Sequence, residues 1–315
     1  MDQRRLKHFV TLAETLHFGE AAARLGMTQP PLSQSIQSLE QELGAPLFHR
    51  TNRRVRLSLL GEQWLPAVQS ALAGVEALPE LARQILRGET GRLEVSFVST
   101  ADYSILPAVV SRFRQQYPEV ELQLTEATSD VQLRQLMEGR GDLGLVIRHE
   151  QSVLPAALAY QKLVVEPLIA AVPEIWLKDG RMDPKAGRLS PRTMSRLPLI
   201  VFPRHVADSF YDLVVGYYER YCSDLNIAQH AIQMQTIISL VSAGMGMALV
   251  PASMQNLARP GVVYLRLSEK APQIESGILW RAEEATPAVH NFIRIAVAQS
   301  AKRGQKKNLP VRLSI

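Results

Sequence analysis

Residues 28–43, TQPPLSQSIQSLEQEL, contain the feature that most restricts what this chain can fold into. Leu32, Ile36 and Leu39 recur at helical spacing, so one face of an amphipathic helix is apolar. Two prolines open the segment, and a first helical turn tolerates proline because its N–H groups have no acceptor within the helix. The opposite face carries glutamine and serine, whereas a solvated face more often carries lysine and glutamate. Short neutral donors and acceptors near a helix N-terminus suit the reading of base edges in a DNA groove, and a merely solvated face is the alternative.

Two shorter helical patterns precede this segment. Residues 6–16 hold a first apolar stripe, and residues 18–25 hold a second one that Gly26 is expected to end. About three residues then lead to Thr28, a suitable N-cap for the next helix. So short a connection predicts a helix-turn-helix whose second helix enters the major groove.

Residues 44–60 contain four arginines and no acidic residue. Val55, Leu57 and Leu59 alternate with polar residues at the period of a strand, after a turn that Thr51 and Asn52 suit. The pattern predicts a wing, a short β-ribbon that brings arginines to the phosphates or the minor groove. A solvated arginine cluster is the alternative, but the neighbouring helix-turn-helix favours the wing. The wing arginines are Arg50, Arg53 and Arg54.

Residues 6–61, LKHFVTLAETLHFGEAAARLGMTQPPLSQSIQSLEQELGAPLFHRTNRRVRLSLLG, resemble the LysR-type transcriptional regulators. The AAARL, TQPPLSQSI and LEQELGAPLFHRT passages are the most specific. Gln34 departs from many members, which carry arginine or histidine there. The resemblance implies that double-stranded DNA contacts Gln29, Pro30, Pro31, Ser33, Gln34 and Gln37 on the helix and Arg50, Arg53 and Arg54 on the wing.

Residues 58–88 are predicted to form one long helix with a heptad-like apolar seam. The seam indicates pairing between subunits, and packing on the helix's own domain is the alternative. Pro79 occupies a seam position and is expected to kink or divide the helix, because it removes an interior hydrogen bond. The family resemblance implies a homodimer through this helix, a pseudo-palindromic DNA site and usually a homotetramer that bends DNA. The seam positions are Leu65, Val68, Leu72, Val75, Pro79, Ala82 and Leu86.

From Gly91 onward, apolar strand patterns alternate with helical ones. LEVSFVS, VELQLTEA and DLGLVIR read as strands, with a helix from about Tyr103 to Gln116 between the first two. KLVVEPLIAAV, LPLIVF, AIQM, MALVP and VVYLRL form a second set, SGILWRA returns to the first sheet, and a last helix covers residues 286–302. This alternation predicts an α/β body with largely parallel sheets in two lobes.

The predicted fold class is therefore mixed: an N-terminal winged helix-turn-helix, a long linker helix and a two-lobed α/β effector domain resembling the periplasmic binding proteins. The expected boundaries are residues 1–60, 61–90 and 91–302, with lobe I at 91–165 and 268–302, lobe II at 166–267, and a basic tail at 303–315. The family resemblance places a small effector in the cleft between the lobes.

Polar side chains follow several of the predicted strands. Ser99 and Thr100 lie where a strand gives way to a helix, whose N-terminal N–H groups favour a carboxylate, although simple capping is the alternative. Phe202 could stack on an aromatic or unsaturated ligand. Arginine and histidine side chains at other strand ends could bind acid groups, with a structural salt bridge as an equal alternative for Arg148. The predicted effector contacts are Ser99, Thr100, Thr128, Arg148, Phe202, Pro203, Arg204 and His205.

The class of effector is inferred from the resemblance. Members that sense benzoate or muconate carry a Ser–Thr-type pair, a threonine and an aromatic residue at the positions of Ser99, Thr100, Thr128 and Phe202. This implies a small organic acid, in particular an aromatic acid or a ring-cleavage product, as effector. An amino acid, a keto acid or a stress metabolite is the alternative, and RNA polymerase is a further implied partner.

Composition and motifs bear on other classes of protein. The net charge is +5, and residues 1–60 carry eight basic and five acidic residues, which indicates a polyanionic partner. The sequence shows no apolar run of about 18 residues, no secretory signal and a single cysteine, Cys222, so we expect no membrane partner and a location in the bacterial cytoplasm, at the nucleoid. These observations also argue against a solute receptor of a transporter.

The sequence shows neither HExxH nor GxSxG, and the glycines of GMGMAL precede a strand instead of following one. We therefore predict that the protein is not an enzyme and binds no cofactor and no metal. A nucleoid-type DNA-binding protein without a ligand stays open, because only ligand binding would exclude it.

Overall fold

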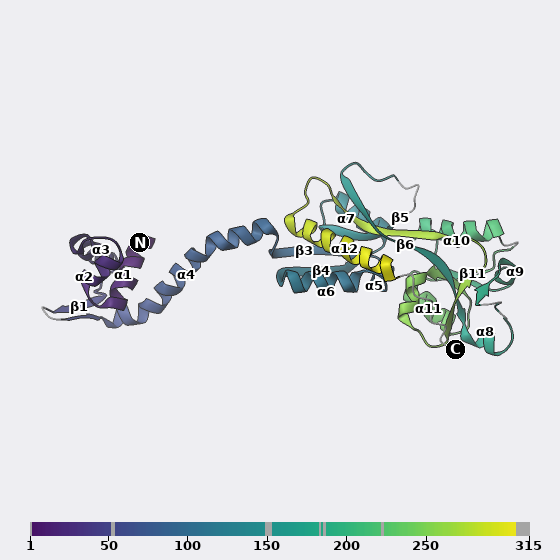
Figure 1. Cartoon of the computed structure of the whole chain (residues 1–315), viewed down its shortest axis with the longest axis horizontal. Coiled ribbons are helices and arrows are strands. Elements are labelled where there is room, and N and C mark those ends of the chain that lie inside the picture. Colours follow the sequence, from purple (N-terminus) through teal and green to yellow (C-terminus); the bar gives the residue numbers. More distant parts are fainter. Residues whose placement is uncertain are drawn as a thin grey trace. The chain divides into compact units, whose positions relative to one another are not determined.

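The computed structural model describes residues 2–51, 54–148, 153–182, 184, 187–221 and 224–306. The chain divides into two compact units, Met1–Gln84 and Ile85–Ile315, which we describe one at a time (Figure 1).

The first unit begins with three helices, α1 (Gln3–Thr15), α2 (Phe18–Arg24) and α3 (Gln29–Leu43). Their apolar stripes meet in one core, where Phe9, Leu32 and Ile36 are fully buried. Gly26, in the turn between α2 and α3, has a φ of 66°, which favours glycine. The predicted helix-turn-helix is confirmed.

A two-stranded ribbon follows, made of β1 (Phe48–Thr51) and β2 (Arg54–Leu57). The predicted alternation through Leu59 was wrong at its end, because Leu59 already begins the next helix. Ser58 separates the two elements: its hydroxyl donates to the Pro46 carbonyl at 2.6 Å and accepts from the Gly61 N–H at 3.1 Å. The predicted turn residue Asn52 lies outside the described residues.

The long helix α4 covers Leu59–Arg87 and contains Pro66 and Pro79. Of the kink or division predicted at Pro79, the division was wrong, since one helix continues through this residue, and the kink stays a prediction. Proline removes one hydrogen bond of the ladder, and the residues after it, ELARQIL, are mostly strong helix formers that maintain the helix. Val68 and Leu72, early in α4, are buried in the core of the first unit.

The second unit is built on an eight-stranded sheet, in which β6 (Leu158–Pro173) serves both lobes. The first part of β6 pairs with β12 (Gln273–Arg281), and its last part pairs with β10 (Ala248–Pro251) and β11 (Val262–Leu267). Because β12 also pairs with β5, the predicted return of the chain to the first sheet is confirmed. The remaining strands of this sheet are β3 (Thr90–Phe97), β4 (Glu119–Glu126), β5 (Leu143–Arg148) and β7 (Arg188–Leu189), and β8 (Leu199–Val201) pairs with β9 (Ile227–His230) in a separate two-stranded sheet.

Helices cover the sheet in each lobe (Figure 1). In lobe I, Phe113 and Phe292 meet with ring centroids 5.3 Å apart in a buried core. In lobe II, Trp176 and Tyr218 are fully buried. The helices are α5 (Ser99–Asp102), α6 (Leu106–Gln116), α7 (Ser129–Met137), α8 (Glu174–Lys178), α9 (Pro191–Met194), α10 (Asp208–Tyr221), α11 (Met234–Ser242), the 3₁₀ helix η1 (Ala252–Leu257) and α12 (Pro287–Lys306).

Three predicted elements of the second unit have different bounds. The helix expected from Tyr103 begins at Leu106, with Pro107 in its first turn, and the short helix α5 precedes it. The strand expected at AIQM was wrong: the strand is β9, which pairs with β8, and Gln233 is already the N-cap of α11. The last helix extends to Lys306. Within the described residues, no helix is both long and apolar enough to cross a membrane.

Candidate functional site

Helix α3 presents two distinct faces. Leu32, Ile36 and Leu39 are fully buried on one side. Thr28 is the N-cap, but its side chain makes no capping hydrogen bond. The first N–H groups of this helix therefore donate no hydrogen bond to the Thr28 side chain. The predicted DNA-contacting residues Gln29, Pro30, Pro31, Gln34 and Gln37 are exposed, and Ser33 is half-buried.

Two contacts fix this helix within its unit. An imidazole nitrogen of His8 on α1 lies 2.7 Å from the Ser35 hydroxyl on α3. Burial, followed by the charge of Arg4, lowers the pKa of His8, which favours the neutral ring in this hydrogen bond. Glu40, near the end of α3, accepts hydrogen bonds from the N–H groups of Leu47 and Phe48 at 2.9 and 3.1 Å. Glu40 therefore attaches the wing to α3, a role that the sequence analysis missed.

The wing arginines have different surroundings. Arg50 forms an ion pair with Glu40 at 3.0 Å and lies over the ring of Phe18, 4.9 Å from its centroid. Arg54 is exposed and makes no ion pair with any residue that the structure describes. Arg53 lies outside the described residues. The charge of Arg50 is thus partly neutralised within the protein, whereas that of Arg54 is available to a phosphate.

This difference gives a prediction for DNA binding. Replacing Arg54 with alanine is expected to reduce the slope of log Kobs against log salt by about 1, because one phosphate contact is lost. Arg50→Ala should change that slope less and should instead lower the melting temperature, because it removes the Glu40 pair. Fluorescence anisotropy at several salt concentrations measures both slopes. Equal slope changes for the two variants would contradict this assignment.

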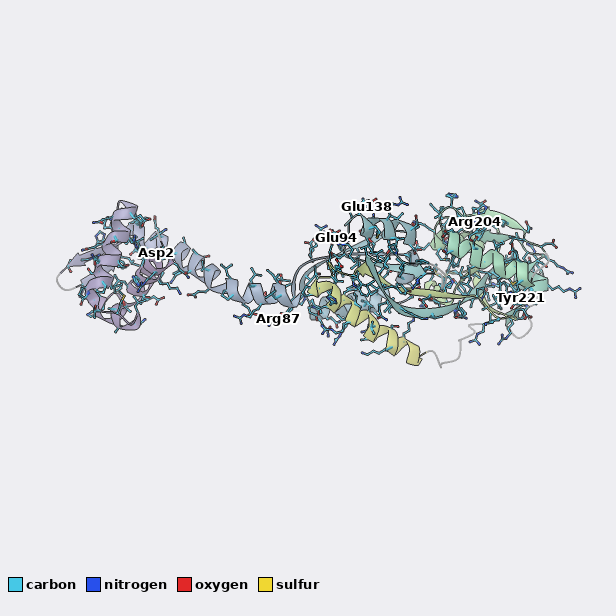
Figure 2. The ribbon with its side chains drawn as sticks, turned by 90° about the horizontal axis from the view of Figure 1, so that it is seen from above. Asp2, Arg87, Glu94, Glu138, Arg204 and Tyr221 are labelled. Atoms are coloured by element: carbon cyan, nitrogen blue, oxygen red, sulfur yellow. The ribbon has the colours of Figure 1, made fainter. Side chains whose placement is uncertain are left out.

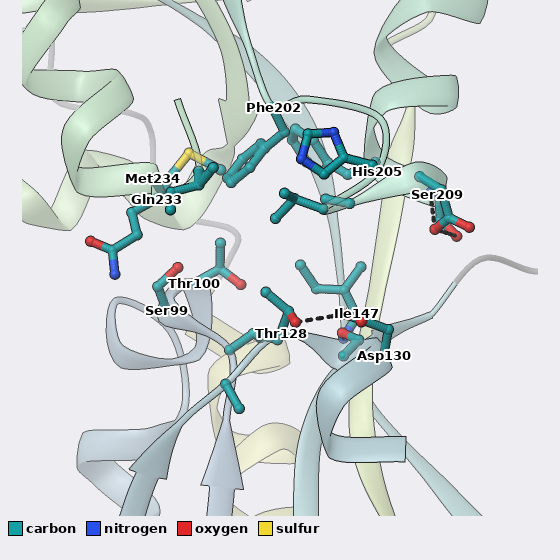
Figure 3. Close-up of a pocket in the computed structure, with 18 of the residues that line it drawn as sticks. Ser99, Thr100, Thr128, Asp130, Ile147, Phe202, His205, Ser209, Gln233 and Met234 are labelled. Carbon is teal, nitrogen blue, oxygen red and sulfur yellow. Dashed lines mark hydrogen bonds between the residues drawn. The ribbon is translucent and has the colours of Figure 1, made fainter. Parts of the chain in front are cut away.

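A cavity of about 540 Å³ lies between the two lobes of the second unit (Figure 3). Lobe I contributes the ends of β3, β4 and β5, and lobe II contributes the segment after β8 and the residues before α11. Helices α7, α10 and α11 all begin at this cavity, since Ser129, Asp208 and Met234 line it. The carboxyl ends of parallel strands meet at one edge of a sheet, which is why residues distant in sequence gather here.

Most of the predicted effector contacts line this cavity. Pro203 does not, although both of its neighbours in the chain do. Arg148 lines a second cavity of about 530 Å³, and its guanidinium lies 5.1 Å from the ring centroid of Tyr160. The predicted residues that the structure brings together are Ser99, Thr100, Thr128, Phe202, Arg204 and His205.

The polar groups of the cavity differ in how far they are already used. Thr100 is 5% exposed, and its hydroxyl has no hydrogen-bond partner among the described residues. The Thr128 hydroxyl donates to Asp130 at 2.5 Å. Arg204, on the surface of the second unit (Figure 2), makes a bidentate pair with Asp212 at 2.9 and 3.2 Å, and this pair raises the pKa of the guanidinium.

Several lining residues were missed by the sequence analysis. Glu126 ends β4, and Asp130 lies in the first turn of α7. Asp208 begins α10, and Gln233 precedes α11. An acidic residue in the first turn of a helix that follows a strand is a signal that could have pointed to Asp130.

A helix-turn-helix with an exposed polar recognition face, in one chain with a two-lobed domain around a ligand-sized cavity, defines a DNA-binding transcriptional regulator. Residues 3–62 match the bacterial regulatory helix-turn-helix protein, lysR family, and residues 86–301 match the LysR substrate binding domain. The chain therefore belongs to the LysR family of transcriptional regulators.

Relatives and solved structures agree with this assignment. The chain is 54% identical over 295 residues to the HTH-type transcriptional regulator IlvR of Caulobacter vibrioides, covering 94% of this chain and 97% of IlvR. It is 34% identical to the HTH-type transcriptional regulator AlsR of Bacillus subtilis, over 96% of this chain and 97% of AlsR. The crystal structure of CbnR, a LysR family regulator, matches with a TM-score of 0.78 and 25% identity, covering 94% of this chain and all of CbnR. A structure of CbnR with its target DNA shares the fold, with a TM-score of 0.79, 24% identity and 95% of this chain covered.

Proposed function

We propose that this regulator binds a small organic acid in the cleft between its lobes and that this binding switches its action on promoter DNA. The observation that supports the proposal is the gathering of six sequence-predicted residues, from both lobes, around one cavity. A ligand that contacts both lobes binds their closed arrangement more tightly than the open one, and so shifts the population between them.

An acid suits the cavity because helix α11 begins there without an acidic residue in its first turn, and the N–H groups of a first helical turn lack acceptors within the helix. The unpartnered Thr100 hydroxyl is a further donor. Phe202 supplies an apolar ring at the cavity. Both effector classes from the sequence, an aromatic or ring-cleavage acid and an amino or keto acid, are compatible with such a lining.

The proposed function includes self-association. The second half of α4 carries exposed apolar side chains, which suit pairing with α4 of a second copy. Two recognition helices related by a two-fold axis would read a pseudo-palindromic promoter site, and a tetramer of two dimers would bend the DNA between two sites. RNA polymerase is the proposed partner at the promoter, in the bacterial cytoplasm. The exposed apolar residues of α4 are Val75, Leu78, Leu81, Ile85 and Leu86.

The test begins with a thermal-shift panel on the full chain, containing benzoate, muconate, aliphatic 2-oxo acids and amino acids. A ligand at about a hundred times its Kd should stabilise the protein by about 2.7 kcal/mol, which raises the Tm by a few degrees. A footprint and a DNA-bending assay at saturation should then change. If every acid leaves the Tm unchanged, or if the active acid leaves the footprint and the bend unchanged, the proposed switch is wrong.

A further inference from the structure

The cavity between the lobes is lined by more negative than positive charge. Glu126, Asp130 and Asp208 contribute three carboxylates, of which Asp130 pairs with Arg134 at 3.6 Å, and His205 lies among the lining residues as well. Arg204 is the arginine of the lining, and Asp212 already engages it through two hydrogen bonds. A ligand that carries only a carboxylate would meet net repulsion from these groups. The charges therefore select for a ligand that also carries a positive group.

The helix N-termini at the cavity differ in whether an acidic side chain of the protein lies in their first turn. Helix α7 has Asp130 in its first turn, and α10 has Asp208, so a carboxylate of the protein already lies at the positive end of each helix. Helix α11 has no acidic residue in its first turn, and its N-cap Gln233 makes no capping hydrogen bond. Among these three helices, α11 therefore offers the start best able to receive the carboxylate of a ligand.

A buried donor lies near the start of α11. Figure 3 shows Ser99 and Thr100 below Gln233 and Met234, while Ser209 of lobe II and Asp130 of lobe I lie on the opposite side of the view, one above the other. Thr100 is 5% exposed, and its hydroxyl has no hydrogen-bond partner among the described residues. A buried hydroxyl without a hydrogen bond is costly, and a ligand oxygen would satisfy it. The cavity thus has a donor end and an acidic end.

Between these ends the walls are apolar. Phe202 and Phe210 of lobe II pack edge to face, with ring centroids 5.4 Å apart, and both line the cavity. Ile147 approaches from lobe I, and Val206 and Ile232 extend the apolar surface in lobe II. This surface suits an uncharged hydrocarbon side chain.

From this arrangement we infer that the effector is a zwitterion, an α-amino acid with an apolar side chain. Its carboxylate lies at Thr100 and the start of α11, and its ammonium lies between Asp130 of lobe I and Asp208 of lobe II. An ammonium held by carboxylates of both lobes links the two lobes and so favours their closure. The inference rests on the proposed function, because it names the ligand of the same cleft.

The closing experiment uses matched ligands that differ only at the charged groups. Titration calorimetry on the full chain compares leucine with 4-methyl-2-oxopentanoate and with 3-methylbutylamine, and phenylalanine with phenylpyruvate. We expect at least one of the two amino acids to bind ten times more tightly than its oxo acid, and we expect the amine to bind weakly. If an oxo acid binds as tightly as its amino acid, the zwitterion inference is wrong and the proposed function stands. If neither amino acids nor oxo acids nor the other acids of the panel bind, the proposed function is wrong as well.

Variants then locate the two ends of the ligand. Asp130→Asn and Asp208→Asn should each lower the affinity for the amino acid at least tenfold, while the affinity for the oxo acid stays unchanged or rises. Thr100→Val should lower the affinity for both ligands without lowering the Tm of the free protein, because the Thr100 hydroxyl makes no hydrogen bond within the described residues. Asp179→Asn, which removes a carboxylate paired with Arg181 outside the cavity, is the matched control and should leave affinity unchanged. Equal losses for both ligands in the two aspartate variants would overturn the assignment of the ammonium.

Discussion

Leu78→Glu in α4 is expected to convert the regulator from a dimer or tetramer into a monomer and to weaken operator binding at least a hundredfold. Leu78 is 55% exposed, and Val75 and Ile85 on the same side of the helix are 44% and 56% exposed. Burying one leucine side chain contributes about 1.5–3 kcal/mol, and a two-fold seam buries it in both copies. The substitution removes that contribution and places two like charges in the seam.

DNA binding should fall with dimerisation because a monomer contacts one half-site and roughly half of the phosphates. Analytical ultracentrifugation measures the assembly, and anisotropy with a full operator measures the affinity. Ala73→Glu is the control: this residue is exposed, and it lies five positions before Leu78, about 140° away around the helix. If Leu78→Glu stays oligomeric, or if Ala73→Glu dissociates equally, the seam proposed for α4 is wrong.

The two halves of α4 show why periodicity could not separate internal packing from pairing. The apolar repeat predicted from Leu65 to Leu86 is one pattern in the sequence. In the structure, Val68 and Leu72 pack in the core of the first unit, while Val75 and Leu86 are exposed. Packing on the helix's own unit therefore accounts for the first half, and pairing between subunits stays a prediction for the second half. A helical stripe reports that a face is apolar and does not report what covers it.

Local patterns predicted the fold well where each element depends on its own spacing. The three stripes of the first unit appeared as α1, α2 and α3, and the strands before Ser99 and Thr128 were found because they are short apolar runs. The strand predicted at AIQM was wrong because pairing with β8 selects IAQH, four residues earlier. That choice depends on a partner strand distant in the sequence.

The residues that line the candidate cleft could be predicted where they follow strands, and less well elsewhere. Thr100 lies just after β3 in lobe I and Phe202 directly after β8 in lobe II, and both strands end at the cavity. Asp208 lies beyond a loop, and nothing in its immediate sequence shows that it would line the same cavity as Asp130 of the other lobe. Arg148 follows a strand as well, yet it lies at the second cavity beside Tyr160. The position of a residue along a strand fixes the edge of the sheet but not the direction of a long side chain.

Glu166 is the clearest case of a structural residue that the sequence does not reveal. It lies on β6, is 4% exposed, and accepts hydrogen bonds from the N–H and the hydroxyl of Ser253, at 2.6 and 3.0 Å. Ser253 belongs to η1, directly after β10, and is 87 residues away in the sequence. These two hydrogen bonds attach η1 to the strand that both lobes share.

Glu166→Ala is expected to destabilise the second unit by about 2–4 kcal/mol and to lower its Tm by roughly 4–12 °C. The substitution leaves the Ser253 N–H and hydroxyl without their acceptor in a buried site and opens a small cavity. Glu166→Gln should reduce the free energy of unfolding by less, because its amide oxygen still accepts one of the two hydrogen bonds. Ser253→Ala should also reduce the free energy of unfolding by less, since the backbone N–H still donates to the carboxylate.

In the double variant Glu166→Ala/Ser253→Ala, the loss of stability should be smaller than the sum of the two single losses, because the two residues share one interaction. Differential scanning calorimetry of the four variants measures these losses, and additive losses would show that the two side chains act independently.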